Sequence, residues 1–108
     1  MRVVRVEQLA AAKAVAATSG LARNVPNPFN SSTQIPYHLS SSGPVRLVIY
    51  NVLGQPARTL VDQFQAAGSY RVRWDARDQE GASLSSGVYF TRLSYPGGVQ
   101  TQRLLYLK

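Results

Sequence analysis

The chain of 108 residues contains no cysteine, a single histidine and only five acidic side chains. The lack of cysteine excludes disulfide bonds, thiolate nucleophiles and zinc sites built on thiolates. His38 has no acidic neighbour in sequence with which to form a catalytic triad or an acid–base pair. No glycine-rich phosphate loop follows a strand and opens a helix. The sequence therefore predicts a protein that is not an enzyme and that uses no cofactor.

Long apolar runs are also missing. No stretch of 18 apolar residues exists, so no transmembrane helix is predicted. The opening residues Met1–Arg5 are followed by Glu7, and the alanine-rich stretch behind them is interrupted by Lys13. This is a poor secretory signal peptide. If the protein is exported, we expect the signal peptide to belong to a longer parent chain.

The small number of acids leaves a net charge of +7, from twelve Lys and Arg residues against five Asp and Glu. Such a chain is attracted to nucleic acid, lipopolysaccharide, acidic polysaccharide or negative protein surfaces. The basic residues are spread along the whole sequence, so specific nucleic-acid binding is not predicted. Arg71 and Arg73 share one face of a predicted strand. With Arg46, and with Arg58 or Arg92, they are candidates for one basic stripe, which would serve solubility or docking to an acidic partner.

The composition changes near residue 23. Residues 1–22 are rich in alanine and lack aromatic side chains, which favours a flexible linker over a helix at Glu7–Ala17. From Asn24 onward, Gly-, Pro-, Asn- and Ser-rich turn signals recur between runs of β-branched and aromatic residues, a pattern typical of a β-sandwich or barrel. We predict a flexible or partly helical extension over 1–23 and one β domain over 24–108.

Six runs are predicted strands, and an extended piece near Val25–Phe29 is a candidate for a seventh. The six are Thr33–Leu39, Val45–Asn51, Ala57–Phe64, Ser69–Asp75, Val88–Tyr95 and Val99–Leu107. Side chains in these runs alternate with a period of two, so that Tyr70, Val72 and Trp74 share one face. Pro36 cannot donate a ladder hydrogen bond, so its strand is expected at an edge or with a bulge. The pattern predicts two antiparallel sheets packed face to face.

Three of the five acids lie close together in the segment 75–81. Asp75, Asp78 and Glu80 are weak candidates for ligands of a hard cation such as calcium. Their spacing does not match an EF-hand, and Arg77 offsets their charge. Asp and Gly also shape tight turns through side-chain-to-backbone bonds and positive φ. The segment therefore favours a turn over a metal site.

Five sequence blocks follow one another in a fixed order through residues 24–108. They are Asn24-Val25-Pro26-Asn27-Pro28-Phe29-Asn30, Val45–Gln55, Ala67-Gly68-Ser69-Tyr70 with Trp74-Asp75, Ser86-Gly87-Val88-Tyr89-Phe90 with Arg92-Leu93, and Gln102–Lys108. Together they resemble the type A C-terminal sorting domains of the type IX secretion system. The immunoglobulin-like domain of the flagellar hook-capping protein is similar in its strand and turn pattern. The chain departs from the sorting-domain pattern at Ser31, where proline is usual, and at Arg103, where lysine is frequent.

The resemblance implies an all-β, immunoglobulin-like antiparallel sandwich of about seven strands that acts as a non-enzymatic secretion signal. In that family the domain ends a cargo protein, passes through the periplasm, and directs the cargo across the outer membrane to the cell surface or the exterior. The implied partners are the outer-membrane translocon, a sortase-like peptidase and anionic lipopolysaccharide.

Two alternative functions stay open at this point. One is a structural or assembly module of the hook-cap kind. The other is a carbohydrate-binding accessory module of a secreted enzyme. The latter requires a flat row of exposed aromatic side chains, for which the candidates are Tyr37, Tyr50, Tyr95 and Tyr106.

Two groups of candidate site residues follow. A terminal strand that completes a sheet can be handed to a receptor by strand addition, so the translocon is expected to recognise the chain end and one end of the sandwich. The expected recognition residues are Gly87, Tyr89, Arg103, Leu105 and Lys108. The expected structural turn residues are Pro26, Asn27, Pro28, Phe29 and Gly54. Phe29 is expected to plug the open end of the sandwich, with a partner-binding knob as the alternative.

Overall fold

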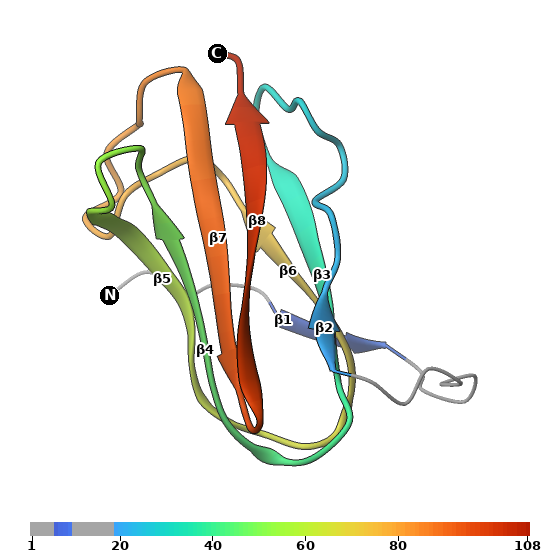
Figure 1. Ribbon diagram of the computed structural model, residues 1–108. Coiled ribbons are helices and arrows are strands. Elements are labelled where there is room, and N and C mark those ends of the chain that lie inside the picture. The colour runs from blue at the N-terminus through green and yellow to red at the C-terminus, as the bar shows by residue number, and fades with distance from the viewer. Residues whose placement is uncertain (1–5, 10–18) are drawn as a thin grey trace.

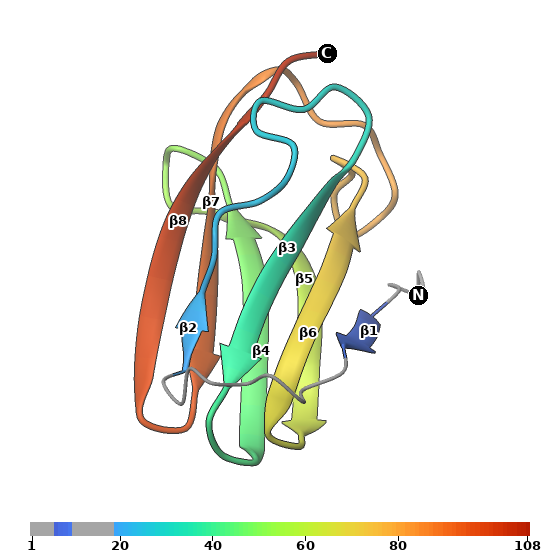
Figure 2. The same cartoon turned by 90° about the vertical axis from the view of Figure 1, so that its right-hand side faces the viewer.

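The computed structural model describes residues 6–9 and 19–108, and these residues form an all-β sandwich (Figure 1). Their eight strands are β1 (Val6–Leu9), β2 (Gly20–Leu21), β3 (Thr33–Leu39), β4 (Gly43–Tyr50), β5 (Pro56–Gln65), β6 (Gly68–Trp74), β7 (Gly87–Tyr95) and β8 (Gly98–Tyr106). Two antiparallel sheets, ordered β1-β6-β3-β2 and β5-β4-β7-β8, pack face to face (Figure 2). The predicted fold class is confirmed. Within these residues no helix is long and apolar enough to cross a membrane.

Six strands coincide with the predicted runs to within two residues at each end. The extended piece at Val25–Phe29 is not a strand, because it contributes only two isolated bridges, Val25 to Gln34 and Phe29 to Tyr106. The chain instead places β1 beside β6 and β2 beside β3. Val6–Leu9 form β1, in a segment where a flexible linker was favoured over a helix at Glu7–Ala17, and residues 10–18 lie outside the described part. The domain boundary after residue 23 stays a prediction.

β3 tolerates Pro36 because it is the last long strand of its sheet. Only the two-residue β2 lies outside it, which corrects the expectation of an edge or a bulge. On the inner side Pro36 pairs with Arg71 in an unbroken register. On the outer side its carbonyl accepts a 3.0 Å hydrogen bond from the Ala22 N–H. The proline nitrogen therefore faces the side on which β2 has ended, and no ladder bond is lost.

Aromatic rings fill one end of the sandwich. Trp74 is fully buried, with the Phe29 ring 5.7 Å and the Tyr89 ring 5.6 Å from its own, centroid to centroid. Phe29 also stacks on Tyr106 at 5.1 Å. The Trp74 indole N–H donates a 3.1 Å hydrogen bond to the Arg77 carbonyl, which satisfies its buried polar atom. Phe29 is thus a buried plug between the two sheets.

A polar bridge ties the sheets at the other end. The Tyr37 hydroxyl of β3 donates a 2.6 Å hydrogen bond to the Gln65 Oε1 of β5. Burial raises the pKa of the Tyr37 phenol well above its usual range, so the group stays protonated and keeps donating. The Tyr37 and Tyr70 rings stack at 5.3 Å, and the Tyr70 hydroxyl donates to the Ala66 carbonyl. Both tyrosines are therefore structural.

Thr91 gives a first testable prediction. Its side chain is buried in β7, and among the described residues its hydroxyl has no hydrogen-bond partner. An unsatisfied buried polar group costs about 1–3 kcal/mol. Thr91→Val, which keeps the shape, is expected to raise the free energy of unfolding by about 1 kcal/mol in urea denaturation. Thr101→Val, at an exposed position of β8, should change it by less than about 0.5 kcal/mol. Equal or lower stability of Thr91→Val would contradict the prediction.

Candidate functional site

The C-terminal part of β8 is hydrogen-bonded on both sides. On the inner side β8 pairs with β7 along its whole length. On the outer side the Phe29 N–H donates to the Leu105 carbonyl at 3.1 Å, and the Leu107 N–H donates to the Phe29 carbonyl at 2.9 Å. The Leu105 N–H donates to the Asn27 Oδ1 at 3.0 Å. The loop that opens the domain and the strand that closes it therefore form one unit, which we term the terminal latch (Asn27, Phe29, Leu105 and Leu107).

The loop that carries the latch is fixed from within. Asn24 is buried, and its Nδ2 donates to the Pro26 carbonyl at 3.1 Å and to the Thr33 Oγ1 at 3.0 Å. The Thr33 hydroxyl donates to the same carbonyl at 2.8 Å. The peptide bonds before Pro26 and Pro28 are both cis. Asn24 and Thr33 were not among the predicted structural residues, although both belong to or border the opening sequence block.

Gly54 belongs to a tight turn between β4 and β5 that one side chain organises. The Asn51 Oδ1 accepts hydrogen bonds from the Leu53 N–H at 2.9 Å and the Gln55 N–H at 3.0 Å. Gly54 has φ of 80°, a conformation that residues with a Cβ rarely adopt. The turn presents Val52 and Leu53 to solvent, with exposed fractions of 65% and 78%.

Four of the five predicted recognition residues gather at this end of the sandwich. Gly87 begins β7 and pairs with Tyr106 of β8, next to half-buried Leu105. Arg103 and Lys108 are exposed. The Lys108 N–H donates a 2.8 Å hydrogen bond to the Ser86 hydroxyl, which holds the chain end against the loop before β7.

Tyr89, the fifth, points inward. It is buried against Trp74, and its hydroxyl donates a 2.7 Å hydrogen bond to the Ser85 carbonyl. A receptor cannot contact this ring without opening the core. The side chain therefore serves the fold, and it holds the loop that precedes Gly87.

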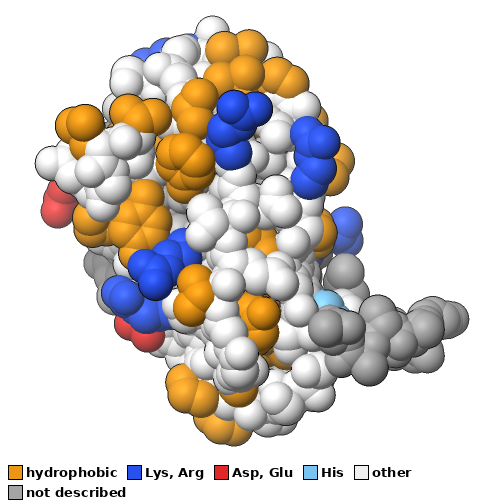
Figure 3. Space-filling model, in the orientation of Figure 1, with side chains coloured by type: hydrophobic (Ala, Val, Ile, Leu, Met, Phe, Trp, Pro, Cys, Tyr) orange, Lys and Arg blue, Asp and Glu red, His pale blue; other side chains and the backbone are white. Residues whose placement is uncertain are grey.

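A hollow of about 480 Å³ lies beside the chain end, between the β4–β5 turn and the segment 84–89. Its walls include Val52, Leu53 and half-buried Leu84. Gly87 adds no side chain, and a Cβ built there would meet nothing within 4 Å. Apolar side chains gather at the end of the molecule that carries this turn and the C-terminus (Figure 3). Val52 and Leu53 were not predicted as site residues, because an apolar pair is ordinarily assigned to a core.

The acidic segment 75–81 forms a turn. The Asp78 Oδ1 accepts hydrogen bonds from the Glu80 N–H at 3.0 Å and the Ala82 N–H at 2.9 Å. Asp75 lies 3.7 Å from the Arg58 guanidinium and 3.9 Å from that of Arg77. In the described part of the chain, no three His, Cys, Asp or Glu side chains are grouped so as to hold a metal ion. The contacts observed at these acids are those of turn formation and ion pairing.

The arginines do not form the single basic stripe for which they were candidates. Arg71 and Arg73 lie on the outer face of the sheet containing β6, whereas Arg46 and Arg92 lie on the outer face of the other sheet. Arg58 is buried, with 3% of its side chain exposed. The prediction failed because strand pairing sends β4 and β6 into different sheets, which a linear pattern does not reveal.

The flat aromatic row required of a carbohydrate-binding module is not formed. Tyr37 and Tyr106 are buried in the core, and Tyr50 and Tyr95 are half-buried. His38 Nδ1 lies 3.0 Å from the Ser69 Oγ. Among the side chains that the structure describes, no carboxylate hydrogen-bonds His38 to complete a triad.

Two solved structures from Porphyromonas gingivalis resemble the chain at 20% identity over 83% of its length: dimeric latent PorU, with a TM-score of 0.63, and PorZ, with a TM-score of 0.53. PorZ is described as an essential bacterial surface component of the type IX secretion system. The chain spans 9% of PorU and 11% of PorZ, so the likeness concerns one domain and shows the fold alone.

No curated protein sequence matches the chain. The sequence profile of the FlgD Ig-like domain matches residues 30–98, which contain all of β3 to β7. The profile stops at the first residue of β8 and begins after Phe29, so it covers neither side of the terminal latch. Because the match extends over more than half of the chain and the two-sheet sandwich agrees with it, the chain belongs to the FlgD Ig-like domain family.

Proposed function

We propose that the chain is a non-enzymatic C-terminal sorting domain, which directs a cargo protein from the periplasm across the outer membrane through the type IX secretion machinery. The terminal latch is the observation that carries the proposal. The opening and closing sequence blocks of the domain, which resemble sorting domains, lie in contact with each other although they are about 80 residues apart. The shared fold with PorZ is consistent with a place in that machinery. A sortase-like peptidase and anionic lipopolysaccharide are further partners under this proposal.

The latch suggests how a receptor would read the signal. β8 is the edge strand of its sheet, and both the N–H and the carbonyl of Leu105 point away from β7. Releasing the Asn27–Phe29 loop would leave these groups free to pair with a receptor strand, and backbone pairing supplies affinity in this mode of recognition. Exposed Arg103 and Lys108 would attract an acidic receptor surface to the same place.

A reporter fusion tests this proposal. The chain is attached to the C-terminus of a periplasmic reporter enzyme in a bacterium with an active type IX system, and reporter activity is measured outside the cell. We expect export with the complete chain and retention in the periplasm after deletion of Val99–Lys108. The double change Arg103→Glu with Lys108→Glu is expected to reduce export at least about fivefold, since it reverses the exposed charge beside the latch.

The control for the charge change is Arg73→Glu with Arg46→Glu, which reverses two exposed arginines on β6 and β4, neither of which pairs with β8. Circular dichroism of each purified variant separates loss of recognition from loss of folding. The proposal would be overturned if export persists after deletion of β8, or if the control charge changes reduce export as much as the changes at Arg103 and Lys108.

The family match favours a second candidate, a structural module of the hook-cap kind. This function predicts that the reporter stays in the periplasm with every version of the chain, including the unchanged one. The same experiment therefore distinguishes the two functions.

A further inference from the structure

We propose that the outer face of the β5-β4-β7-β8 sheet, beside the β4–β5 turn, docks an extended peptide segment that combines acidic and aliphatic side chains. This surface lies on the face of the sheet and not along the latch edge. The inference therefore does not depend on the export function and holds equally for an assembly module.

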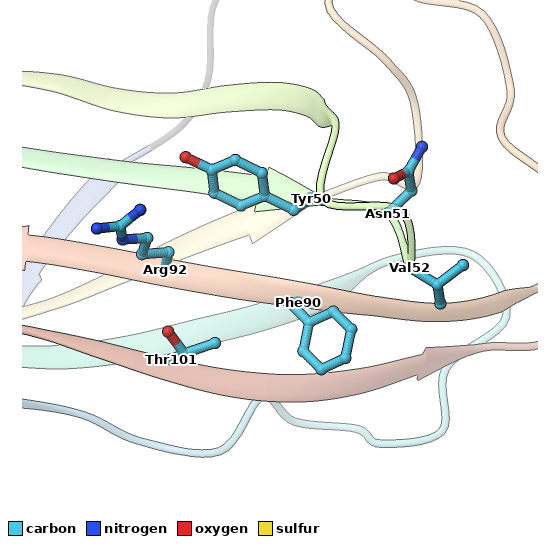
Figure 4. A pocket seen from close by; sticks show the side chains of 7 residues that line it. Tyr50, Asn51, Val52, Phe90, Arg92 and Thr101 are labelled. Carbon is cyan, nitrogen blue, oxygen red and sulfur yellow. The ribbon is translucent and has the colours of Figure 1, made fainter.

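The floor of the surface is a hollow of about 300 Å³ that crosses three strands (Figure 4). Tyr50 of β4 is paired with Phe90 of β7, and Arg92 of β7 is paired with Thr101 of β8. Figure 4 shows these four side chains on one face of the sheet, with Val52 of the turn next to Phe90. The hollow thus has an aromatic floor, a cation along one side and an aliphatic wall at one end.

The cations of this surface lack partners of opposite charge. Among the side chains that the structure describes, neither the Arg92 nor the Arg103 guanidinium is hydrogen-bonded or ion-paired. Arg103 does not line this hollow, but it is paired in register with Phe90 and adds a second positive charge beside that ring. Asp62 lies toward the other edge of the sheet, on β5, within 3.7 Å of Arg46. A negatively charged group on the ligand would therefore complement the positive charge of this surface.

The aliphatic part of the surface is held in place. Val52 lines both this hollow and the larger one at the chain end, so it stands between them. The Asn51 side chain bonds fix the turn, which keeps Val52 and Leu53 exposed in a defined position. Exposed apolar side chains on a rigid turn, rimmed by charge, are typical of a protein interaction site. A partner therefore needs aliphatic side chains next to its acidic ones.

Other occupants fit this surface less well. A second copy of the chain would bring another net charge of +7 to a basic face. Single-stranded nucleic acid stacks on ring faces that are open to solvent, whereas Tyr50 and Phe90 are half-buried and the most exposed apolar residues here are aliphatic. An acidic and aliphatic peptide satisfies both parts of the surface.

The test is a titration of the 15N-labelled full chain, followed by NMR, with a peptide made of repeated Glu-Leu-Asp-Val units. We expect amide shifts at Val52, Leu53, Phe90, Arg92 and Thr101. Arg92→Glu and Val52→Asp are each expected to weaken binding about tenfold or more, because each removes one of the two complementary features. Arg73→Glu, an equal charge change on the outer face of the other sheet, should weaken it less than about twofold.

Two control probes complete the experiment. A Glu-Ser-Asp-Ser peptide keeps the charge without aliphatic groups and should bind at least about tenfold more weakly. Oligo-deoxythymidylate tests the nucleic-acid alternative. The proposal is overturned if the shifts map to β3 and β6, if Arg73→Glu weakens binding as much as Arg92→Glu, or if the Ser-containing peptide binds as well. Tighter binding of the oligonucleotide through the same amides would also overturn it. Dispersed spectra of each variant establish that it is folded.

Discussion

Replacing Trp74 with alanine is expected to lower the free energy of unfolding by about 3–5 kcal/mol. Trp74 is fully buried and touches the rings of Phe29 and Tyr89, so its removal leaves a large cavity where both sheets and the opening loop meet. Domains of this size have total stabilities of about 5–15 kcal/mol. The variant is therefore expected to lose a large part of its stability. Thermal denaturation should show a lower unfolding midpoint, and urea denaturation a lower free energy of unfolding.

Phe64→Ala is the matched control, because the Phe64 side chain is 70% exposed on β5. An aromatic-to-alanine change at such a position normally alters stability by less than about 0.5 kcal/mol. If Trp74→Ala and Phe64→Ala destabilise the protein equally, the aromatic cluster is not the centre of the core.

The strands were predictable because their determinants are local. Turn residues divide the sequence into runs, and the period of two in Ser69–Asp75 assigned Trp74 to the buried face. The turn at Gly54 was also predicted, because Asn51 and a positive φ act within five residues. Information of this kind does not depend on how the strands are arranged in space.

The partition of strands between sheets was not predictable in the same way. Arg46 and Arg71 were assigned to one stripe, but β4 and β6 lie in opposite sheets. β5 adds a second difficulty, because the register between β4 and β5 shifts twice, after Leu47 and after Ile49. A bulge changes which side chains face inward, so simple alternation could not reveal that Arg58 is buried.

The residues of the candidate site were likewise predictable only where their determinants are local in sequence. The sequence predicted functional residues in both halves of the terminal latch, since each half carries its own motif. Only the folded chain shows that the Leu105 N–H is hydrogen-bonded to Asn27. The docking surface was missed, since Tyr50, Arg92 and Thr101 come from three strands that are adjacent only after pairing. To predict a site made by several strands, one must know how the strands pair and in which register, whereas a site made by one turn can be predicted from the local sequence.

Replacing Arg58 with alanine is expected to destabilise the protein by about 3–5 kcal/mol. The Arg58 side chain is 3% exposed, and its guanidinium lies 3.7 Å from Asp75 and donates to the Arg77 and Asp78 carbonyls at 3.4 Å. Without it, Asp75 would remain largely buried, at 18% exposure, beside a new cavity. Urea denaturation of the purified variant measures the loss.

The Arg46–Asp62 pair provides an unusually close control. Its charged atoms are also 3.7 Å apart, but the side chains are 55% and 67% exposed, so Arg46→Ala should cost no more than about 1 kcal/mol. Arg58→Met combined with Asp75→Leu should recover much of the loss, because a buried pair can be replaced by apolar side chains of similar volume. If the two alanine variants lose equal stability, burial does not distinguish these pairs. If Arg58→Ala alone is severely destabilised, Arg58 is the residue that fixes the segment 75–81 to β5.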